Sequence, residues 1–325
     1  MGSSGGRPHE PVLLAEVLVQ LAGAGVPAAL RAEAGAVVRF LDATVGAGGH
    51  AAAILDRTAP LGRLLGLDRD PAALEVARRQ LGRFGERLVL ARANFARCDS
   101  VAGEHGFGAL DGALFDLGLS SIQLADDARG FSFRSGGPLD MRADPDLGTT
   151  AADLVNTSPV DELRRMFREL GDEPEAARIA SAIVRRRARE PFATADELGR
   201  FVAGVKTRRP RSIDPATQVF QALRMAVNGE LDNLARGLEG AVRLLRPGGR
   251  LAVISFHSLE DRTVKQFFVR ESRDCICPPH LPTCVCGHRA GLRVITRRPL
   301  TAEADEVARN PRARSARLRI AEKLS

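Results

Sequence analysis

Short apolar runs that are typical of buried strands alternate with helical stretches through the first 125 residues of the chain. The strand-like runs cover residues 37–42, 64–68, 88–93 and 112–117, and helical patterns cover 51–55 and 72–84. Parallel strands need such crossovers, because each helix returns the chain to the same edge of the sheet. The pattern therefore predicts an α/β fold with a mostly parallel, Rossmann-like sheet and helices on both of its faces.

The alternation stops after residue 125. Residues 126–223 show no convincing strand, and their helical patterns cover 161–170, 173–189 and 195–204. About 100 residues are far more than an ordinary crossover contains. We therefore expect a discontinuous Rossmann-like domain over 1–125 and 224–325, and an inserted all-helical domain over 126–223.

The pattern of the sheet resumes after the insertion. A helix is expected over 221–245, a turn at 247–249 and a strongly apolar strand over 250–256. The last two apolar runs, 292–297 and 316–322, could pair as an antiparallel hairpin that closes the sheet.

A glycine-rich loop, Asp42-Ala-Thr-Val-Gly-Ala-Gly-Gly-His50, follows the first strand. Its spacing is not the G-x-G-x-x-G of a nicotinamide site, and the chain has no G-K-[ST] to hold a triphosphate. A strand, an acidic residue and a loop of small residues together suit S-adenosylmethionine, which carries no phosphate. The alternative is a βα turn whose glycines serve packing alone.

Three further candidate residues stand at expected strand ends. Asp68 lies 22 residues beyond the first glycine of the loop, where an acid receives hydrogen bonds from ribose hydroxyls in doubly wound folds. Phe95 could pack on an adenine ring or lie in the core. Asp116 could accept a hydrogen bond from the cofactor or from a target amine. As helix N-caps, Asp70 and Ser120 are better placed than Asp68 and Asp116.

The segment Ser255-Phe-His-Ser-Leu-Glu-Asp261 places a titratable ring, two hydroxyls and two acids directly after a buried strand. His257 and Asp261 are therefore candidates for proton transfer. A purely structural histidine is the competing interpretation.

Basic residues are concentrated near the end of the chain. The net charge is +7, and residues 262–325 carry 14 Arg and Lys against 6 Asp and Glu. A basic surface attracts phosphate backbones, although ordinary solubility is the simpler explanation. With no Trp or Tyr, base stacking would fall to Phe, His or Arg. Crowded cysteines and the lack of an apolar leader or a membrane-length apolar run predict a cytoplasmic protein.

Several ordered blocks give the chain a resemblance to a known family. They include His9-Glu-Pro-Val-Leu-Leu14, the loop Asp42–His50, Gly66-Leu-Asp-Arg-Asp-Pro71, Asp116-Leu-Gly-Leu-Ser-Ser121, Arg129-Gly-Phe-Ser-Phe133, Gly137-Pro-Leu-Asp-Met-Arg142, the run Ser255–Arg262 and Asn310-Pro-Arg-Ala-Arg-Ser315. The chain resembles the RsmH (MraW)-type methyltransferases. These enzymes use S-adenosylmethionine to methylate the N4 amine of a cytidine in small-subunit ribosomal RNA.

The resemblance implies a class I S-adenosylmethionine-dependent methyltransferase fold. It makes 16S ribosomal RNA or the small ribosomal subunit the partner, excludes a membrane and leaves a homodimer open. It places the cofactor contacts on Gly48, Gly49, His50, Asp68, Phe95, Asp116 and Gln123. Gln123 would otherwise be interpreted as a solvated helix residue. One departure is Gln218, where the family usually has Arg. If that Arg contacts RNA, the contact is weaker in this chain or is supplied by Arg208, Arg209 or Arg211.

Two other functions compete with this one. The first is a methyltransferase that acts on another RNA or on cytosine in DNA. The second is a non-catalytic nucleic-acid-binding protein that keeps the methyltransferase fold. The intact glycine loop, Asp68 and Asp116 argue against the second.

A cytosine N4 amine is a poor nucleophile because its lone pair is delocalised into the ring. An acceptor for its N–H bonds would favour attack, and we expect Asp116 to be this acceptor, with His257 or Asp261 relaying the proton. The target base must leave its stack, and Phe131, Phe133 or His257 could pack on it. The basic runs 185–187, 206–211 and 312–319 are candidate phosphate contacts, although the first is more simply a solvated helix face.

Four of the five cysteines form two C-x-C pairs, Cys275 with Cys277 and Cys284 with Cys286. Zinc sites with four thiolates usually have C-x2-4-C spacing, so we expect no metal, and zinc at these four residues is the alternative. A catalytic role is not expected, because a similar stretch occurs in only some members of the family.

Overall fold

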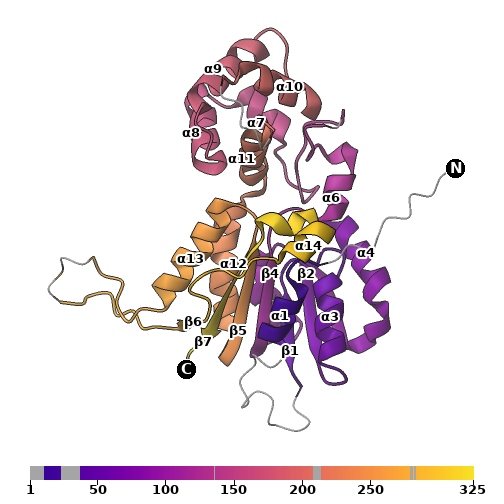
Figure 1. The fold of residues 1–325 in the computed structure, drawn as a ribbon, viewed down its shortest axis with the longest axis vertical. Coiled ribbons are helices and arrows are strands. Elements are labelled where there is room, and N and C mark those ends of the chain that lie inside the picture. Colours follow the sequence, from indigo (N-terminus) through magenta and orange to yellow (C-terminus); the bar gives the residue numbers. More distant parts are fainter. Residues whose placement is uncertain (1–10, 23–36, 135, 208–213, 279–280, 282) are drawn as a thin grey trace. The chain divides into compact units, whose positions relative to one another are not determined.

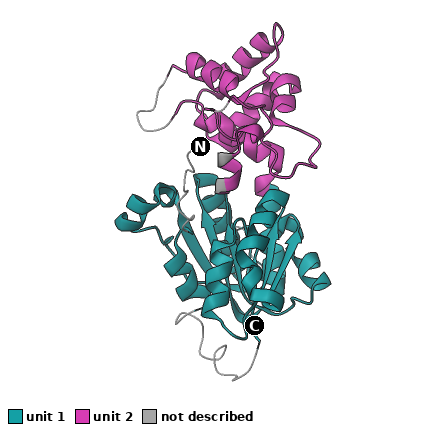
Figure 2. Cartoon of the chain, turned by 90° about the vertical axis from the view of Figure 1, so that its right-hand side faces the viewer, with its two compact units in different colours: residues 1–118, 232–325 teal, residues 119–231 magenta. Residues whose placement is uncertain are grey.

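The computed structural model describes residues 11–22, 37–134, 136–207, 214–278, 281 and 283–325. The chain divides into two compact units, which Figure 2 shows in different colours. One consists of residues 1–118 and 232–325, and the other of residues 119–231. The expected insertion, 126–223, lies inside the second unit. A boundary at 223 would cut helix α11 (Thr217–Asn228), which continues to Gly229.

The first unit is built on a seven-stranded sheet with the order β3-β2-β1-β4-β5-β7-β6 (Figure 1). The strands are β1 (Arg39–Asp42), β2 (Arg63–Asp68), β3 (Leu88–Arg92), β4 (Leu110–Asp116), β5 (Leu245–Ser255), β6 (Leu292–Val294) and β7 (Arg317–Lys323). The first five are parallel, whereas β7 pairs antiparallel with both β5 and β6. The predicted α/β class with a mostly parallel, Rossmann-like sheet is confirmed.

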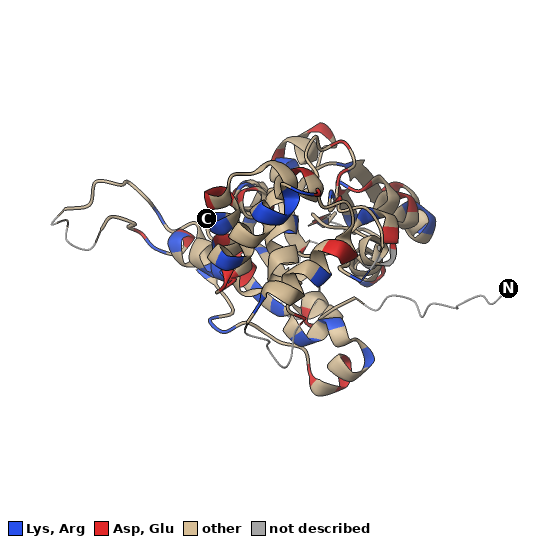
Figure 3. Cartoon of the chain, turned by 90° about the horizontal axis from the view of Figure 1, so that it is seen from above, with Lys and Arg blue, Asp and Glu red and all other residues tan. Residues whose placement is uncertain are grey.

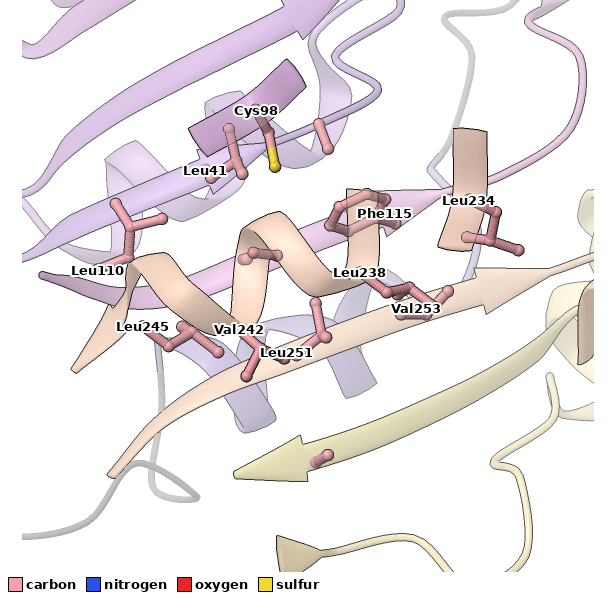
Figure 4. Packing of buried hydrophobic residues seen from close by; sticks show 14 of the residues in the cluster. Leu41, Cys98, Leu110, Phe115, Leu234, Leu238, Val242, Leu245, Leu251 and Val253 are labelled. Atoms are coloured by element: carbon pink, nitrogen blue, oxygen red, sulfur yellow. The ribbon is translucent and has the colours of Figure 1, made fainter. Parts of the chain in front are cut away.

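Helices cover both faces of this sheet. They are α1 (Leu14–Leu21), α3 (Gly49–Arg57), α4 (Pro71–Leu81), α5 (Cys98–Glu104), α12 (Glu230–Leu244), α13 (Ser258–Glu271) and α14 (Ala304–Arg309), with the 3-10 turns η1 (Gly82–Arg87), η2 (Phe95–Arg97) and η4 (Pro311–Ser315). On one face, Leu234 and Leu238 of α12 pack against Phe115 and Val253 (Figure 4). Neighbouring strand residues point to opposite faces, so each strand has to be apolar throughout.

The opposite face has its own core. Phe40, Leu114 and Ile254 of the strands lie in one buried cluster with Ile54 of α3 and Leu74 of α4. This double cover explains why the strands form continuous apolar runs rather than alternating patterns.

One prediction about the return to the sheet was wrong in detail. The helix expected over 221–245 is two helices, α11 and α12, because Gly229 adopts a left-handed φ of 58° that ends the first. The final antiparallel pair, β6 and β7, forms as expected, and the segment between the two strands contains α14 and η4.

The second unit is a group of helices with a separate core. They are α6 (Ser121–Ala125), the 3-10 turn η3 (Asp127–Arg129), α7 (Ala151–Thr157), α8 (Val160–Gly171), α9 (Ala176–Arg187), α10 (Ala195–Val205) and α11. Phe167, Ile183 and Leu223 lie in its buried cluster. Within the described ranges, this unit contains only an isolated bridge between Pro138 and Thr194 and no named strand. None of the helices in the described part of the chain is long and apolar enough to cross a membrane.

Candidate cofactor and catalytic site

Three adjacent strands end in an aspartate. Asp42 ends β1, Asp68 ends β2 and Asp116 ends β4, and β1 lies between the other two strands. In the register, Asp42 pairs with Gly66 and with Leu114, so Asp68 and Asp116 each extend two residues beyond it. Parallel strands lie about 4.8 Å apart. The strand order therefore gathers three carboxyl groups at the edge where ligands bind in open parallel sheets.

Asp68 organises the glycine-rich loop. Its Oδ2 accepts a hydrogen bond from the N–H of Gly46 at 3.0 Å, and its Oδ1 accepts one from the N–H of Asp70 at 2.9 Å. Asp70 is the N-cap of α4, and its side chain accepts from the N–H of Ala72, which confirms the cap that was expected at this residue. Each carboxylate oxygen of Asp68 has a second acceptor site, so the residue can still receive hydroxyl hydrogen bonds.

Packing accounts for two of the loop glycines. Gly48 has a φ of 92°, and a Cβ added there would lie 2.7 Å from Leu81 Cδ1. A Cβ on Gly49 would lie 2.5 Å from Pro11 Cγ. Side chains at either position would clash within the protein, so the loop is closely packed before any ligand is considered.

The acids hold their protons unusually tightly. Burial, together with the charges of Asp42 and Glu260, raises the pKa of Asp116 to about 8. Burial raises the pKa of Asp42 to about 7, against a hydrogen bond from the N–H of Thr44. Burial also raises the pKa of Asp68 to about 6, against hydrogen bonds from Asp70 and Gly46. Like charges in one site disfavour ionisation of the carboxyl groups. A cationic ligand would offset this repulsion, so the cluster suits such a ligand.

Asp116 contacts the hydroxyl of Thr44 through its main chain and the ring of His50 through its side chain. Its N–H donates to Thr44 Oγ1 at 2.7 Å, and its Oδ2 lies 3.5 Å from Nδ1 of His50. The other ring nitrogen of His50, Nε2, lies 3.0 Å from the carbonyl oxygen of Val12. An Nε2–H donor to that carbonyl leaves the Nδ1 lone pair of a neutral ring facing Asp116.

The second oxygen of Asp116 has no such neighbour. Oδ1 is buried, and it has no hydrogen-bond partner in the described part of the chain. A buried carboxyl oxygen without a partner is costly and marks a position where a ligand donor fits.

His257 and Glu260 form the start of α13. The ring of His257 caps the helix by accepting from the N–H of Glu260, while Glu260 Oε2 accepts from the N–H of Phe256 at 2.9 Å. Nε2 of His257 lies 3.2 Å from Glu260 Oε1. Glu260 is buried and raises the pKa of Asp116, so it belongs to the acid cluster. Sequence reasoning counted Asp42 and Glu260 in their motifs, but it did not predict that both act on Asp116.

Asp261 lies in a different network. Its carboxylate accepts from Arg319 Nε at 2.6 Å and Nη2 at 3.0 Å, and from Arg317 at 3.1 Å. Burial alone would raise the pKa of Asp261, but these two arginines hold it below its usual range. A carboxylate held in this way is a poor proton relay, which argues against the expected role of Asp261 in proton transfer.

Phe95 opens the 3-10 turn that follows β3. Its ring meets that of Phe115 edge to face, with centroids 5.6 Å apart, and the side chain is half-buried. Gly237 of α12 makes room for it, since a Cβ there would lie 2.8 Å from Phe95 Cδ2. Part of the ring therefore stays accessible to a planar ligand.

The remaining predicted site residues belong to the other unit. Gln123 is buried and forms a capping box with Ser120, which is the helix N-cap as expected. Phe131 lies in the helical core, and Phe133 packs on Phe220 at a centroid distance of 5.4 Å.

The structure corrects one of the expected phosphate contacts. Lys206 is buried, and its Nζ donates to Glu173 at 2.7 Å and to the side chain of Gln218 at 3.3 Å, so it is not available to RNA. Gln218 also donates to the carbonyl of Asp172 at 2.7 Å, a structural role that explains a neutral residue at this position.

The other basic candidates differ in exposure. Arg314 is exposed and Arg312 is half-buried, while Arg317 is engaged with Asp261. In the run 185–187, Arg185 is exposed, Arg186 pairs with Glu190 and Glu197, and Arg187 donates to the carbonyl of Val155 at 2.7 Å. Arg208, Arg209 and Arg211 lie outside the described residues.

Comparisons with known proteins agree with this architecture. The chain is 53% identical over 317 residues to the ribosomal RNA small subunit methyltransferase H of Thermomicrobium roseum, an alignment that covers 98% of this chain and 94% of the relative. It is 53% identical over 297 residues to the protein of the same name from Syntrophotalea carbinolica, covering 91% and 94%. The family model described as the MraW methylase family matches residues 6–324. The chain therefore belongs to the MraW methylase family.

Proposed function

We propose that the chain transfers a methyl group from S-adenosylmethionine to the N4 amine of a cytidine in 16S ribosomal RNA. The relatives named ribosomal RNA small subunit methyltransferase H support the class of substrate. The observation that carries the proposal is the acid cluster at three adjacent strand ends, in which Asp116 keeps one buried oxygen without a partner among the described residues. We place the reaction in the cytoplasm, where ribosomal subunits are assembled.

The described residues fit the cofactor. Asp68 would receive the ribose hydroxyls, and Phe95 would pack on the adenine. The main chain of Gly48, Gly49 and His50, at the start of α3, would border the ligand. The role of Gln123 rests on the resemblance alone.

When bound, S-adenosylmethionine supplies an electrophilic methyl group on a positively charged sulfur. The protein's acids suit such a ligand because a nearby positive charge favours ionised carboxylates. Binding of the cation should therefore lower the pKa of Asp116 and Asp42 and leave Asp116 ionised near neutral pH.

Asp116 is the proposed hydrogen-bond acceptor for the target amine. The pKa of Asp116 is about 8 in the protein alone, and the bound cation lowers it toward the working pH, so the carboxyl group is ionised and still a stronger base than an ordinary aspartate. Its Oδ1 would accept from the N–H of the base, and Nδ1 of His50 lies 3.5 Å from Oδ2. We propose that His50 shares the proton that Asp116 takes up. His257 remains a candidate for contact with the base.

RNA would be held by basic surfaces and by the helical unit. Figure 3 shows Lys and Arg interspersed with Asp and Glu along the chain, so candidate phosphate contacts have to be argued from individual basic residues. Arg314, exposed in η4, is the clearest described candidate in the tail for a phosphate contact.

Three acceptors test the proposal. Purified protein is incubated with methyl-labelled cofactor and with small ribosomal subunits, free 16S ribosomal RNA or DNA. Label in the RNA of the subunit or in free 16S RNA, and none in DNA, supports the proposal. Label in DNA alone would favour the DNA cytosine alternative, and cofactor binding without any transfer would favour a non-catalytic protein.

A further inference from the structure

A long connection joins α13 to β6 and projects from the first unit (Figure 1). The described residues of segment 272–291 contain no helix or strand. Its larger apolar side chains are exposed: Ile276 by 43%, Leu281 by 41% and Val285 by 78%. A segment of this length without a core needs another source of order to offset its conformational entropy.

Hydrogen bonds join the two ends of the segment at its base. The N–H of Gly291 donates to the carbonyl of Glu271 at 2.8 Å, and the N–H of Ala290 donates to Asp274 Oδ1 at 3.3 Å. Just beyond this base, the chain reverses so that the two C-x-C pairs come together.

The four thiols have the spacing of a single-ion site. The Sγ atoms of Cys275, Cys277, Cys284 and Cys286 all lie within 4.8 Å of one another. Sγ of Cys284 is 3.6 Å from that of Cys286, which is 3.8 Å from that of Cys275. Four sulfurs bound tetrahedrally at about 2.3 Å from zinc lie about 3.8 Å apart. All four thiols are free rather than joined as disulfides.

Backbone amides also point at these sulfurs. The N–H groups of Ile276, Cys277 and Val285 each lie 3.4 Å from a cysteine Sγ, those of Cys286, Cys275 and Cys277 respectively. Such donors stabilise thiolates and orient metal ligands. Gly287, directly after the last cysteine, has a φ of 60°, which turns the chain away from the cluster.

We propose that Cys275, Cys277, Cys284 and Cys286 bind one zinc ion in a closed tetrahedral site that orders segment 272–291. Four protein ligands leave no open position, so the ion is structural rather than catalytic. Thiolates around a two-iron or four-iron cluster would be farther apart than these, which favours a single ion. C-x-C spacing is uncommon among zinc ligands, which is why the sequence favours no metal. Spacing does not show, however, that the two pairs face each other in the folded chain.

The metal content of the full-length chain tests this site. Protein without a histidine tag, purified under reducing conditions, should contain about one zinc ion per chain by mass spectrometry. The double variant Cys284→Ser/Cys286→Ser should lose nearly all of the zinc. Cys98→Ala, which removes the buried fifth cysteine in α5, is the matched control and should retain the zinc.

A second measurement does not depend on the variants folding. Wild-type protein stripped by a chelator and loaded with cobalt(II) should show the absorption bands of a tetrahedral thiolate complex. Limited proteolysis should cut segment 272–291 faster in the stripped protein than in the zinc-loaded protein. Reduced wild-type protein that binds neither metal would overturn the proposal. So would zinc retained by the double variant, or iron or disulfides found in place of zinc.

Discussion

Replacing Asp116 with asparagine tests the electrostatics of the site and the chemistry together. The folded protein holds the proton of Asp116 with a pKa of about 8, whereas the unfolded chain releases it near 3.8. The native state therefore binds more protons than the unfolded state between these values, and stability falls as the pH rises. The asparagine side chain of the Asp116→Asn variant is neutral at every pH. The stability of the variant should therefore not fall in this way as the pH rises.

The size of the effect follows from the two pKa values. Each unit of pKa shift corresponds to about 1.4 kcal/mol. Between pH 6 and pH 8.5, titration of Asp116 should lower the free energy of unfolding of the wild type by about 2.5 kcal/mol relative to Asp116→Asn. Asp42 and Glu260 are also relieved of a neighbouring charge in the variant, which adds to its advantage at high pH.

Urea unfolding at both pH values, with the wild type and the variant side by side, measures this difference. Asp161→Asn, in an exposed position of α8, is the control and should follow the wild type. In the same preparation, Asp116→Asn should bind cofactor but lose most of its methyl transfer. Parallel stability curves for wild type and Asp116→Asn, or undiminished turnover with normal cofactor binding, would refute the account of Asp116.

Three other substitutions probe separate parts of the molecule. Lys206→Met leaves the fully buried carboxylate of Glu173 without its partner and should lower the free energy of unfolding by about 3–5 kcal/mol in urea titrations. Arg314→Glu should weaken binding to 16S ribosomal RNA and lower the slope of log affinity against log salt by about 1, with cofactor affinity unchanged in calorimetry. Gly237→Ala should displace Phe95 and weaken cofactor binding several-fold, because the new Cβ would lie 2.8 Å from the ring.

Each of these substitutions has a control. Lys206→Met combined with Glu173→Leu should recover much of the lost stability, and a loss below about 1 kcal/mol in the single variant would contradict the buried pair. Arg57→Glu, on α3, should leave RNA binding unchanged. Gly240→Ala lies one turn further along α12 and meets Cys98 Sγ at 2.9 Å, so it should disturb packing without weakening cofactor binding. Equal effects of both glycine variants on the cofactor would contradict the role of Phe95.

The strands of the sheet were predictable because burial on both faces makes them continuous apolar runs. Helix α5 was not predicted, since a short helix such as Cys98–Glu104 has little periodic signal. The helix end at Gly229 was not predicted either, because a single glycine inside a helical pattern is often tolerated. Only the structure shows that this glycine takes a left-handed conformation and separates two helices.

Most residues of the candidate site could be named from the sequence, but their arrangement as a cluster could not. Asp68 and Asp116 stand at strand ends in the sequence, whereas the burial of Asp42 between them depends on the order β2-β1-β4. The pairing of Asp261 with Arg319 joins residues 58 positions apart and depends on β7 lying beside β5. The thiol cluster likewise needs a chain reversal that residue spacing does not specify. Local sequence thus identifies chemistry at each strand end, and only the topology decides which groups share a site.

The identity of the methylated nucleoside tests the central claim most directly. Small ribosomal subunits that lack the modification are incubated with the protein and cofactor, and their RNA is digested and analysed by mass spectrometry against standards. We predict N4-methylcytidine in 16S ribosomal RNA, formed by the wild type and nearly absent with Asp116→Asn. A methyl group on carbon 5 of the cytosine ring, or on no nucleoside of the small subunit, would contradict the account.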